Sequence, residues 1–187
     1  MMKKTLTALM AGGAMMVSAQ SAQALDELTV AYFLEWPTPN QFAQHNKLYS
    51  EKLGIPVKWV SFDAGTAMSA AMASGDVHIS FSQGVTPFLV ATAAGQDLQI
   101  VDIAVTYSDN DNCVVRSELE IDKDNVSEEL PGKKVAVPLG TAAHSGFLAQ
   151  MKHFGIDEAS LTIVDMAPSD SAAAFSQPNT DLAMACG

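Results

Sequence analysis

The chain has 187 residues, and its 21 acidic side chains outnumber its 10 basic ones, which gives a formal net charge of −11. This balance argues against a nucleic-acid-binding protein, because such proteins use lysine and arginine to neutralise phosphates. The 2 cysteines exclude a disulfide-dense scaffold and a four-cysteine zinc site. With 48% apolar residues, the chain has the composition of a folded protein of about one domain.

Residues 1–24 have the pattern of an export signal. Lys3 and Lys4 precede a mostly apolar run, and the segment closes on the small-residue cleavage pattern Ala22-Gln23-Ala24. The alternative, a transmembrane anchor, needs an uninterrupted apolar span of about 20 residues, which is missing. Cleavage after residue 24 would remove two lysines and no acid, leaving 163 residues with a net charge of −13. We therefore expect an exported protein, located in a bacterial periplasm.

Apolar runs typical of strands alternate with helical patterns along the rest of the chain. Strands are expected over residues 28–33, 57–62, 77–82, 98–107, 113–115, 134–137, 161–165 and 182–187, and helices over 39–53, 67–74, 85–94, 141–154 and 169–176. This alternation predicts parallel βαβ units and an open α/β sheet. The acidic connection at 117–132 divides the units into two clusters, so we predict a first lobe over 25–115, a partial second lobe over 116–187, and a cleft between them.

Ligands of open α/β sheets bind beyond the carboxyl ends of the strands, where strands turn into helices. Five such turns are expected, at residues 34–40, 63–66, 82–86, 138–144 and 166–171. The turns at 82–86 and 138–144 combine hydroxyl groups with a helix start, whose free N–H groups and dipole attract anions. The alternative is that Ser82, Thr86 and Thr141 only cap their helices.

The turn after the first strand offers groups for a cation. The carboxylate of Glu35 and the ring of Trp36 are suited to an ammonium group, with help from Asp109 and Asp111. Taken individually, each of these residues fits a solvated turn better than a binding role. Met68 and Met72, four residues apart on one helix, indicate core packing.

No enzymatic or metal-binding pattern is present. The sequence has no Gly-rich nucleotide motif, no catalytic-serine motif and no histidine spacing for a metal. A nucleophilic Cys113 is the remaining enzymatic option, although thiols of exported proteins usually pair or are buried. We expect a protein that is not an enzyme and holds neither a metal nor a cofactor.

Three segments carry a resemblance to a known family: AMASGDVHI at 71–79, GKKVAVP at 132–138 and TAAH at 141–144. They resemble the periplasmic substrate-binding proteins of taurine, alkanesulfonate and nitrate ABC importers, and the taurine-binding branch most of all. The resemblance implies a type II periplasmic-binding-protein fold, a monomer that closes around its ligand and delivers it to an ABC permease in the inner membrane. Members of the family are longer, so we expect the second lobe and the return segment to be incomplete.

The resemblance also implies which residues bind a small sulfonate, with the sulfonate at the two helix starts and an ammonium group at Glu35 or Asp111. His144 has the alternative of facing the helix packing. The implied positions are Glu35, Trp36, Ser82, Gln83, Gly84, Asp111, Thr141, Ala142, Ala143 and His144. The acidic balance favours a zwitterion such as taurine over a bare anion. The alternatives are a cofactor- or pyrimidine-precursor-related protein on the same fold, or a non-functional truncated remnant.

The two cysteines fall at strand ends that should face the region between the lobes. Cys113 and Cys186 are therefore expected either to form a disulfide or to remain as two separate buried thiols.

Overall fold

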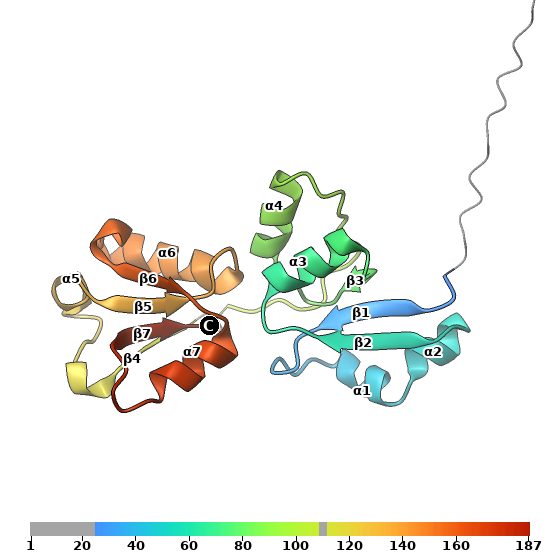
Figure 1. Cartoon of the computed structure of the whole chain (residues 1–187), viewed down its shortest axis with the longest axis horizontal. Coiled ribbons are helices and arrows are strands. Elements are labelled where there is room, and N and C mark those ends of the chain that lie inside the picture. The colour runs from blue at the N-terminus through green and yellow to red at the C-terminus, as the bar shows by residue number, and fades with distance from the viewer. Residues whose placement is uncertain (1–24, 109–111) are drawn as a thin grey trace, which may run out of the picture.

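The computed structural model describes residues 25–108 and 112–187 as two α/β units, each built on its own sheet (Figure 1). The predicted export signal at 1–24 lies outside the described residues, and so do Asp109 and Asp111. The mixed α/β class and its parallel strand pairs are confirmed. No helix within the described ranges is long and apolar enough to cross a membrane.

The first unit is a parallel three-stranded sheet in the order β2-β1-β3. Its core is small: Ala31 and Met68 are fully buried, Val77 nearly so, and Met72 packs against them, as the helical spacing of the methionines predicts. The strands of this unit are β1 (Leu28–Tyr32), β2 (Val57–Ser61) and β3 (Ile79–Ser80), and its helices are α1 (Asn40–His45), α2 (Leu48–Leu53), α3 (Gly65–Ser74) and α4 (Val85–Ala93).

The second unit is a four-stranded sheet in the order β4-β7-β5-β6, in which only β4 is antiparallel to its neighbour. Every residue of β7 is buried, and Phe147 and Met151 of α6 pack into the same core. The strands are β4 (Cys113–Val115), β5 (Lys134–Val137), β6 (Thr162–Asp165) and β7 (Leu182–Cys186), and the helices are α5 (Val126–Glu129), α6 (Ala142–Phe154) and α7 (Pro168–Phe175), with short 3-10 turns η1 (Ser117–Leu119) and η2 (Glu158–Ser160).

Strand β4 belongs to the second sheet, whereas the predicted domain limit assigns residues 113–115 to the first lobe. Its backbone pairs with β7, so that Cys113 lies opposite Cys186 and Val115 opposite Met184. The crossover between the units therefore ends before β4, and the limits of the two lobes otherwise stay a prediction.

The strand predicted over 98–107 is wrong, because no strand forms between α4 and β4 in the described residues. The apolar side chains that suggested it are largely in solvent, with Val101 83% and Ile103 72% exposed. A strand needs a neighbouring strand for its backbone hydrogen bonds, and no described segment pairs with this one.

The helix predicted over 39–53 is divided into α1 and α2. Lys47 adopts the left-handed conformation, with a φ of 58°, and this interrupts the helical backbone. Strand β3 is also shorter than expected and pairs with β1 at only two positions.

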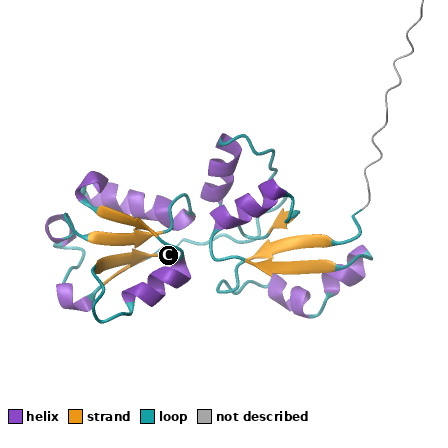
Figure 2. Cartoon of the chain, in the orientation of Figure 1, coloured by secondary structure: helices purple, strands orange, loops and turns teal. Residues whose placement is uncertain are grey.

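The parallel strands of the two units point toward each other. Figures 1 and 2 show β1 and β2 running from one side, and β5 and β7 from the other, so that their carboxyl ends meet between the units. The turns that follow these strands are therefore gathered in one place, as expected for a ligand site of an open α/β sheet.

Candidate functional site

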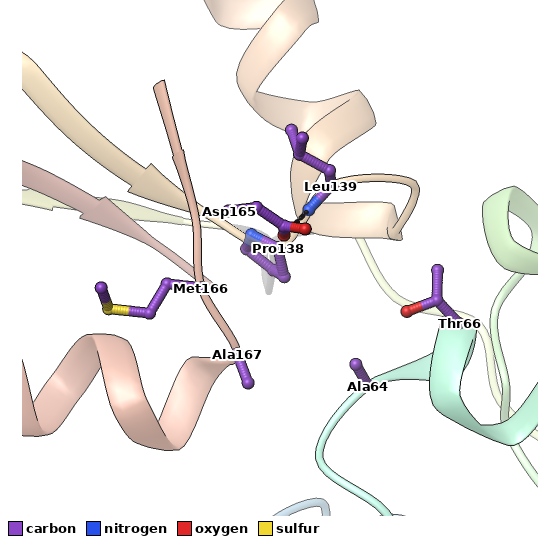
Figure 3. A pocket seen from close by; sticks show the side chains of 7 residues that line it. All are labelled: Ala64, Thr66, Pro138, Leu139, Asp165, Met166 and Ala167. Carbon is purple, nitrogen blue, oxygen red and sulfur yellow. Dashed lines mark hydrogen bonds between the residues drawn. The ribbon is translucent and has the colours of Figure 1, made fainter. Parts of the chain in front are cut away.

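A cavity of about 360 Å³ lies between the two units, at their facing strand ends (Figure 3). Its walls come from three strand-to-helix turns: β2–α3 of the first unit, and β5–α6 and β6–α7 of the second. The lining residues are Ala64, Thr66, Pro138, Leu139, Asp165, Met166 and Ala167. Of the ten residues that the sequence suggested for binding, the nine that the structure describes are not among them.

The first unit contributes the start of α3 to this cavity. Ala64 holds the N-cap position, where its methyl side chain offers no oxygen to the helix. The carbonyl of Ala64 accepts the N–H groups of Ala67 and Met68, whereas those of Gly65 and Thr66 have no partner among the described residues. The Thr66 side chain extends from the same turn into the cavity wall. This wall thus supplies hydrogen-bond donors at the positive end of a ten-residue helix.

The second unit contributes a carboxylate from the end of β6. One oxygen of Asp165 accepts the backbone N–H of Leu139 at 3.0 Å, which ties the β5–α6 turn to the neighbouring strand. Asp165 is exposed to solvent, and none of the ion pairs among the described residues involves it. The opposing walls therefore differ in character, with donors on one side and a carboxylate on the other.

The predicted turn at 82–86 supports α3 instead of lining the cavity. The side-chain amide of Gln83 donates to the carbonyl of Gly65 at 3.1 Å and contacts the hydroxyl of Ser69. The approach is so close that a Cβ on Gly65 would lie 2.5 Å from the carbonyl oxygen of Gln83. Ser82 takes a left-handed backbone, and Gly84, with a φ of 91°, precedes α4 without any side-chain cap.

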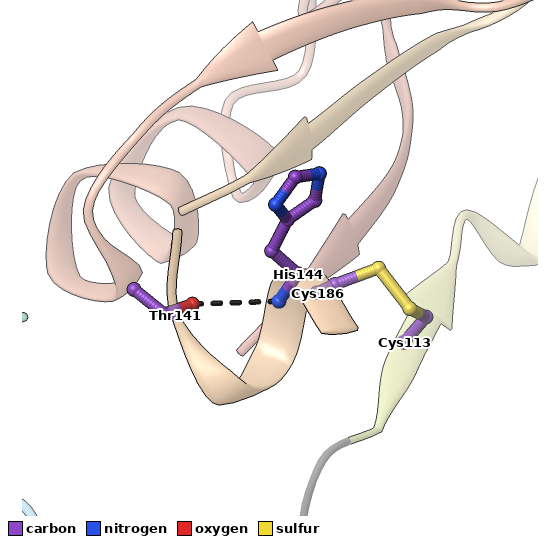
Figure 4. Close-up of a disulfide and its surroundings, with 4 residues drawn as sticks. All are labelled: Cys113, Thr141, His144 and Cys186. Carbon is purple, nitrogen blue, oxygen red and sulfur yellow. Dashed lines mark hydrogen bonds between the residues drawn. A yellow bond between two sulfur atoms is a disulfide. The ribbon is translucent and has the colours of Figure 1, made fainter. Parts of the chain in front are cut away.

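At the start of α6, the capping interpretation holds for Thr141. Its hydroxyl oxygen accepts the N–H of His144 at 3.4 Å (Figure 4). The same hydroxyl donates to the carbonyl of Pro138 at 2.6 Å. Nδ1 of His144 accepts the N–H of Gly140 at 3.2 Å, so the imidazole folds back onto its own turn. Its Nε2 is buried and has no partner among the described residues. Ala143 is buried and Ala142 half-buried within the same first turn.

Glu35 and Trp36 lie in the bend after β1, outside the cavity. The Trp36 ring packs on Tyr107, with 5.1 Å between the ring centroids, and Glu35 is exposed. The indole therefore anchors the segment that leads to the second unit. Asp111, the other acid proposed for an ammonium group, is outside the described residues.

Direct contacts hold the two units together around the cavity. The hydroxyls of Thr86 and Ser145 lie 3.0 Å apart, and the hydroxyl of Ser169 donates to the carboxylate of Asp63 at 3.1 Å. Gly140 of the second unit lies close to Thr66 of the first. A Cβ on Gly140 would lie 3.3 Å from the methyl group of Thr66.

A disulfide joins Cys113 and Cys186 in the structure, across the antiparallel pair β4–β7 (Figure 4). Both half-cystines lie at the end of the sheet that faces the first unit, and 73 residues separate them in sequence. Neither contributes to the cavity lining. In the described parts of the chain, no group of three or more histidine, cysteine or acidic residues is placed to hold a metal.

Sequence reasoning named the right turns but not the residues that line the cavity. The turns at 63–66 and 166–171 were expected from the alternation of strands and helices, and they supply Thr66 and Ala167. Asp165, the last residue of β6, was missed because it lies just before a predicted turn. Its signal was available: a charged residue that ends an otherwise apolar parallel strand faces the ligand edge of the sheet.

The chain matches a family model described as NMT1/THI5 like over residues 39–186. The protein belongs to this family. Among its curated relatives, it is 31% identical to the taurine-binding periplasmic protein of Escherichia coli K12 over 163 residues, which cover 87% of this chain and 48% of that protein. It is 30% identical to a putative aliphatic sulfonates-binding protein of the same organism over 125 residues, covering 67% of this chain and 38% of that protein.

Solved structures show the same fold. The alkanesulfonate-binding protein SsuA of Xanthomonas axonopodis pv. citri, bound to MOPS, superposes with a TM-score of 0.77 at 23% identity, covering 88% of this chain and 55% of that one. The aliphatic sulphonate-binding protein SsuA of Escherichia coli gives a TM-score of 0.62 at 24% identity, with coverages of 87% and 54%. The periplasmic-binding-protein fold is therefore confirmed, and the chain spans about half the length of the relatives it matches.

Proposed function

We propose that this protein is the solute-binding component of an ABC importer and that it binds taurine or a related small sulfonate between its two units. The observation that carries the proposal is the cavity at the facing strand ends, which joins three strand-to-helix turns. Its volume of about 360 Å³ is at the lower end of the range of small-molecule sites. The names of the relatives, which bind taurine or aliphatic sulfonates, point to the same class of ligand.

The chemistry of the cavity suits a sulfonate. The free N–H groups of Gly65 and Thr66 and the hydroxyl of Thr66 are donors at a helix start, and such a group attracts a negative charge. Binding here requires no chemical step. The contacts between the units, such as Thr86 with Ser145, would hold the two units together around a bound ligand.

Calorimetry on the exported chain tests this function. Titrations with taurine, ethanesulfonate and leucine should give heat with one or both sulfonates and none with leucine. The taurine-binding protein of Escherichia coli, measured in parallel, controls for the quality of the ligands. Absence of heat with both sulfonates would overturn the proposal and would favour a remnant or a ligand of another class.

We also propose a periplasmic location, delivery to an inner-membrane ABC permease, and a monomeric state. The export pattern of residues 1–24 and the periplasmic relatives support the location. Fractionation of cells that express the chain with and without residues 1–24 tests it: the full chain should appear in the periplasm, and the shortened chain should stay in the cytoplasm. Periplasmic recovery of the shortened chain would contradict the role of this segment.

A further inference from the structure

Among the described residues that line the cavity, Asp165 is the single charged side chain. Figure 3 shows its carboxylate on the wall made by the second unit, with Thr66 and Ala64 on the other side. None of these described lining residues is a lysine or an arginine, so no side chain among them neutralises this charge. A ligand with only a negative group would therefore be repelled by the carboxylate of Asp165.

The carboxylate is positioned but not saturated. One oxygen accepts the N–H of Leu139 at 3.0 Å, which orients the side chain, and the other has no hydrogen-bond partner among the described residues. An ionised carboxylate accepts about four hydrogen bonds, so Asp165 keeps most of its accepting capacity for a ligand. An ammonium group, with three N–H donors, is its natural complement.

Two other carboxylates, each just after a strand of the first unit, are less suited to this task. Glu35 is exposed in the bend after β1 and does not line the cavity. Asp63, near the rim, already accepts a hydrogen bond from Ser169 at 3.1 Å and takes part in joining the two units.

We propose that Asp165 binds the ammonium group of the ligand and makes the protein select a zwitterionic aminosulfonate over an alkanesulfonate of the same length. The inference rests on the proposed function and adds the orientation of the ligand in that same cavity. The sulfonate lies toward Thr66 and the start of α3, and the amine lies toward β6. A charge-assisted hydrogen bond of this kind corresponds to about a 10- to 100-fold difference in affinity.

Calorimetry with taurine and ethanesulfonate, which differ in the amine, tests the assignment on three variants of the full chain. Asp165→Asn removes the charge and keeps the oxygen that accepts the N–H of Leu139. Asp165→Glu retains the charge, and Asp170→Asn, at an exposed position on α7 outside the cavity, is the control for net charge.

The wild-type chain and Asp170→Asn should prefer taurine to ethanesulfonate. Asp165→Asn should lose about 10- to 100-fold in taurine affinity and nothing for ethanesulfonate, whereas Asp165→Glu should retain part of the preference. An unchanged taurine preference in Asp165→Asn, or an equal loss for both ligands, would overturn the role of Asp165 while leaving sulfonate binding intact. If the wild-type chain binds neither ligand, the proposed function fails and the assignment fails with it.

Discussion

The hydroxyl oxygens of Thr86 and Ser145 lie 3.0 Å apart and join two helix starts that are 59 residues apart in sequence. Thr86 is in the first turn of α4 and Ser145 in the first turn of α6, so this hydrogen bond connects the two units beside the cavity. In a protein that buries a ligand between two units, such a contact stabilises the ligand-bound arrangement, because it forms only when the units meet.

Removing this contact should weaken ligand binding modestly. Thr86→Val and Ser145→Ala should each reduce taurine affinity by about two- to tenfold, since a neutral hydrogen bond contributes about 0.5–1.5 kcal/mol. The double variant should lose no more than either single variant, because both changes remove the same interaction.

The control for this pair is Thr92→Val on the same helix. The hydroxyl of Thr92 bonds only to carbonyls of α4 itself, so its loss should leave affinity unchanged. Additive losses in the double variant, or a loss in Thr92→Val as large as in Thr86→Val, would contradict a direct contact between the units.

Gly65 permits α3 to approach the β3–α4 turn, and its replacement should therefore destabilise the protein. A Cβ at this position would lie 2.5 Å from the carbonyl oxygen of Gln83 and 2.6 Å from Cγ of Pro87. We expect Gly65→Ala to lower the free energy of unfolding by about 1–3 kcal/mol, measured by urea denaturation. Helix propensity alone predicts the opposite sign, a gain of up to about 1 kcal/mol, so a stabilised variant would contradict the close packing.

The disulfide between Cys113 and Cys186 should contribute substantially to stability. With a sequence separation of 73 between the half-cystines, the chain-entropy model gives about 4 kcal/mol. The variant Cys113→Ser/Cys186→Ser should unfold at correspondingly lower urea concentration, and reduced wild-type protein should behave like this variant. Thiol titration of the denatured, unreduced protein should find no free thiol, and two free thiols would contradict the bridge.

The segment at 98–107 should tolerate truncation of its apolar side chains. Val101 is 83% exposed, so Val101→Ala should change the free energy of unfolding by less than about 0.5 kcal/mol. Val135, on β5, is fully buried, and Val135→Ala should cost about 2 kcal/mol for two lost methyl groups and their cavity. Equal losses in the two variants would indicate that the segment is packed as a strand.

Stability should also depend weakly on pH through Asp181. The hydrogen bond from the Lys134 ammonium group, followed by its charge, lowers the pKa of Asp181 below its ordinary value of 3.8. A lowered pKa in the folded state means that the stabilisation is present above pH 3.8 and disappears as the pH falls through the folded-state pKa. The melting temperature of Asp181→Asn should therefore be lower than that of the wild type at pH 7 and equal to it in strong acid. A difference that persists undiminished in acid would contradict this pairing.

Much of the fold follows from the order of apolar patterns in the sequence. The apolar run at 135–137 and the Ala- and Met-rich stretch from 182 become the buried parts of strands β5 and β7, because both faces of a covered parallel sheet are apolar. The segment at 98–107 has the same local pattern and is not a strand. The difference lies in its neighbours, since pairing is decided by distant parts of the chain that a local pattern does not contain.

The site was predictable at the level of turns but not of side chains. Parallel topology alone places the turns after β5 and β6 at one edge of the second sheet, and the turn after β2 at the corresponding edge of the first sheet. Whether a side chain points into the cavity depends on packing and on its backbone partners. Thr141 and His144 have the chemistry of an anion site, yet the Thr141 hydroxyl and Nδ1 of His144 are used within the start of α6. No binding motif surrounds Asp165 in the sequence, yet the structure places this residue in the cavity wall.

The most direct test of sulfonate binding between the units is a crystal structure of this chain with taurine. We expect ligand density in the cavity between Thr66 and Asp165, with the amine within hydrogen-bond distance of the Asp165 carboxylate. Taurine beside Trp36 or at His144, with the cavity filled only by water, would contradict the proposed site.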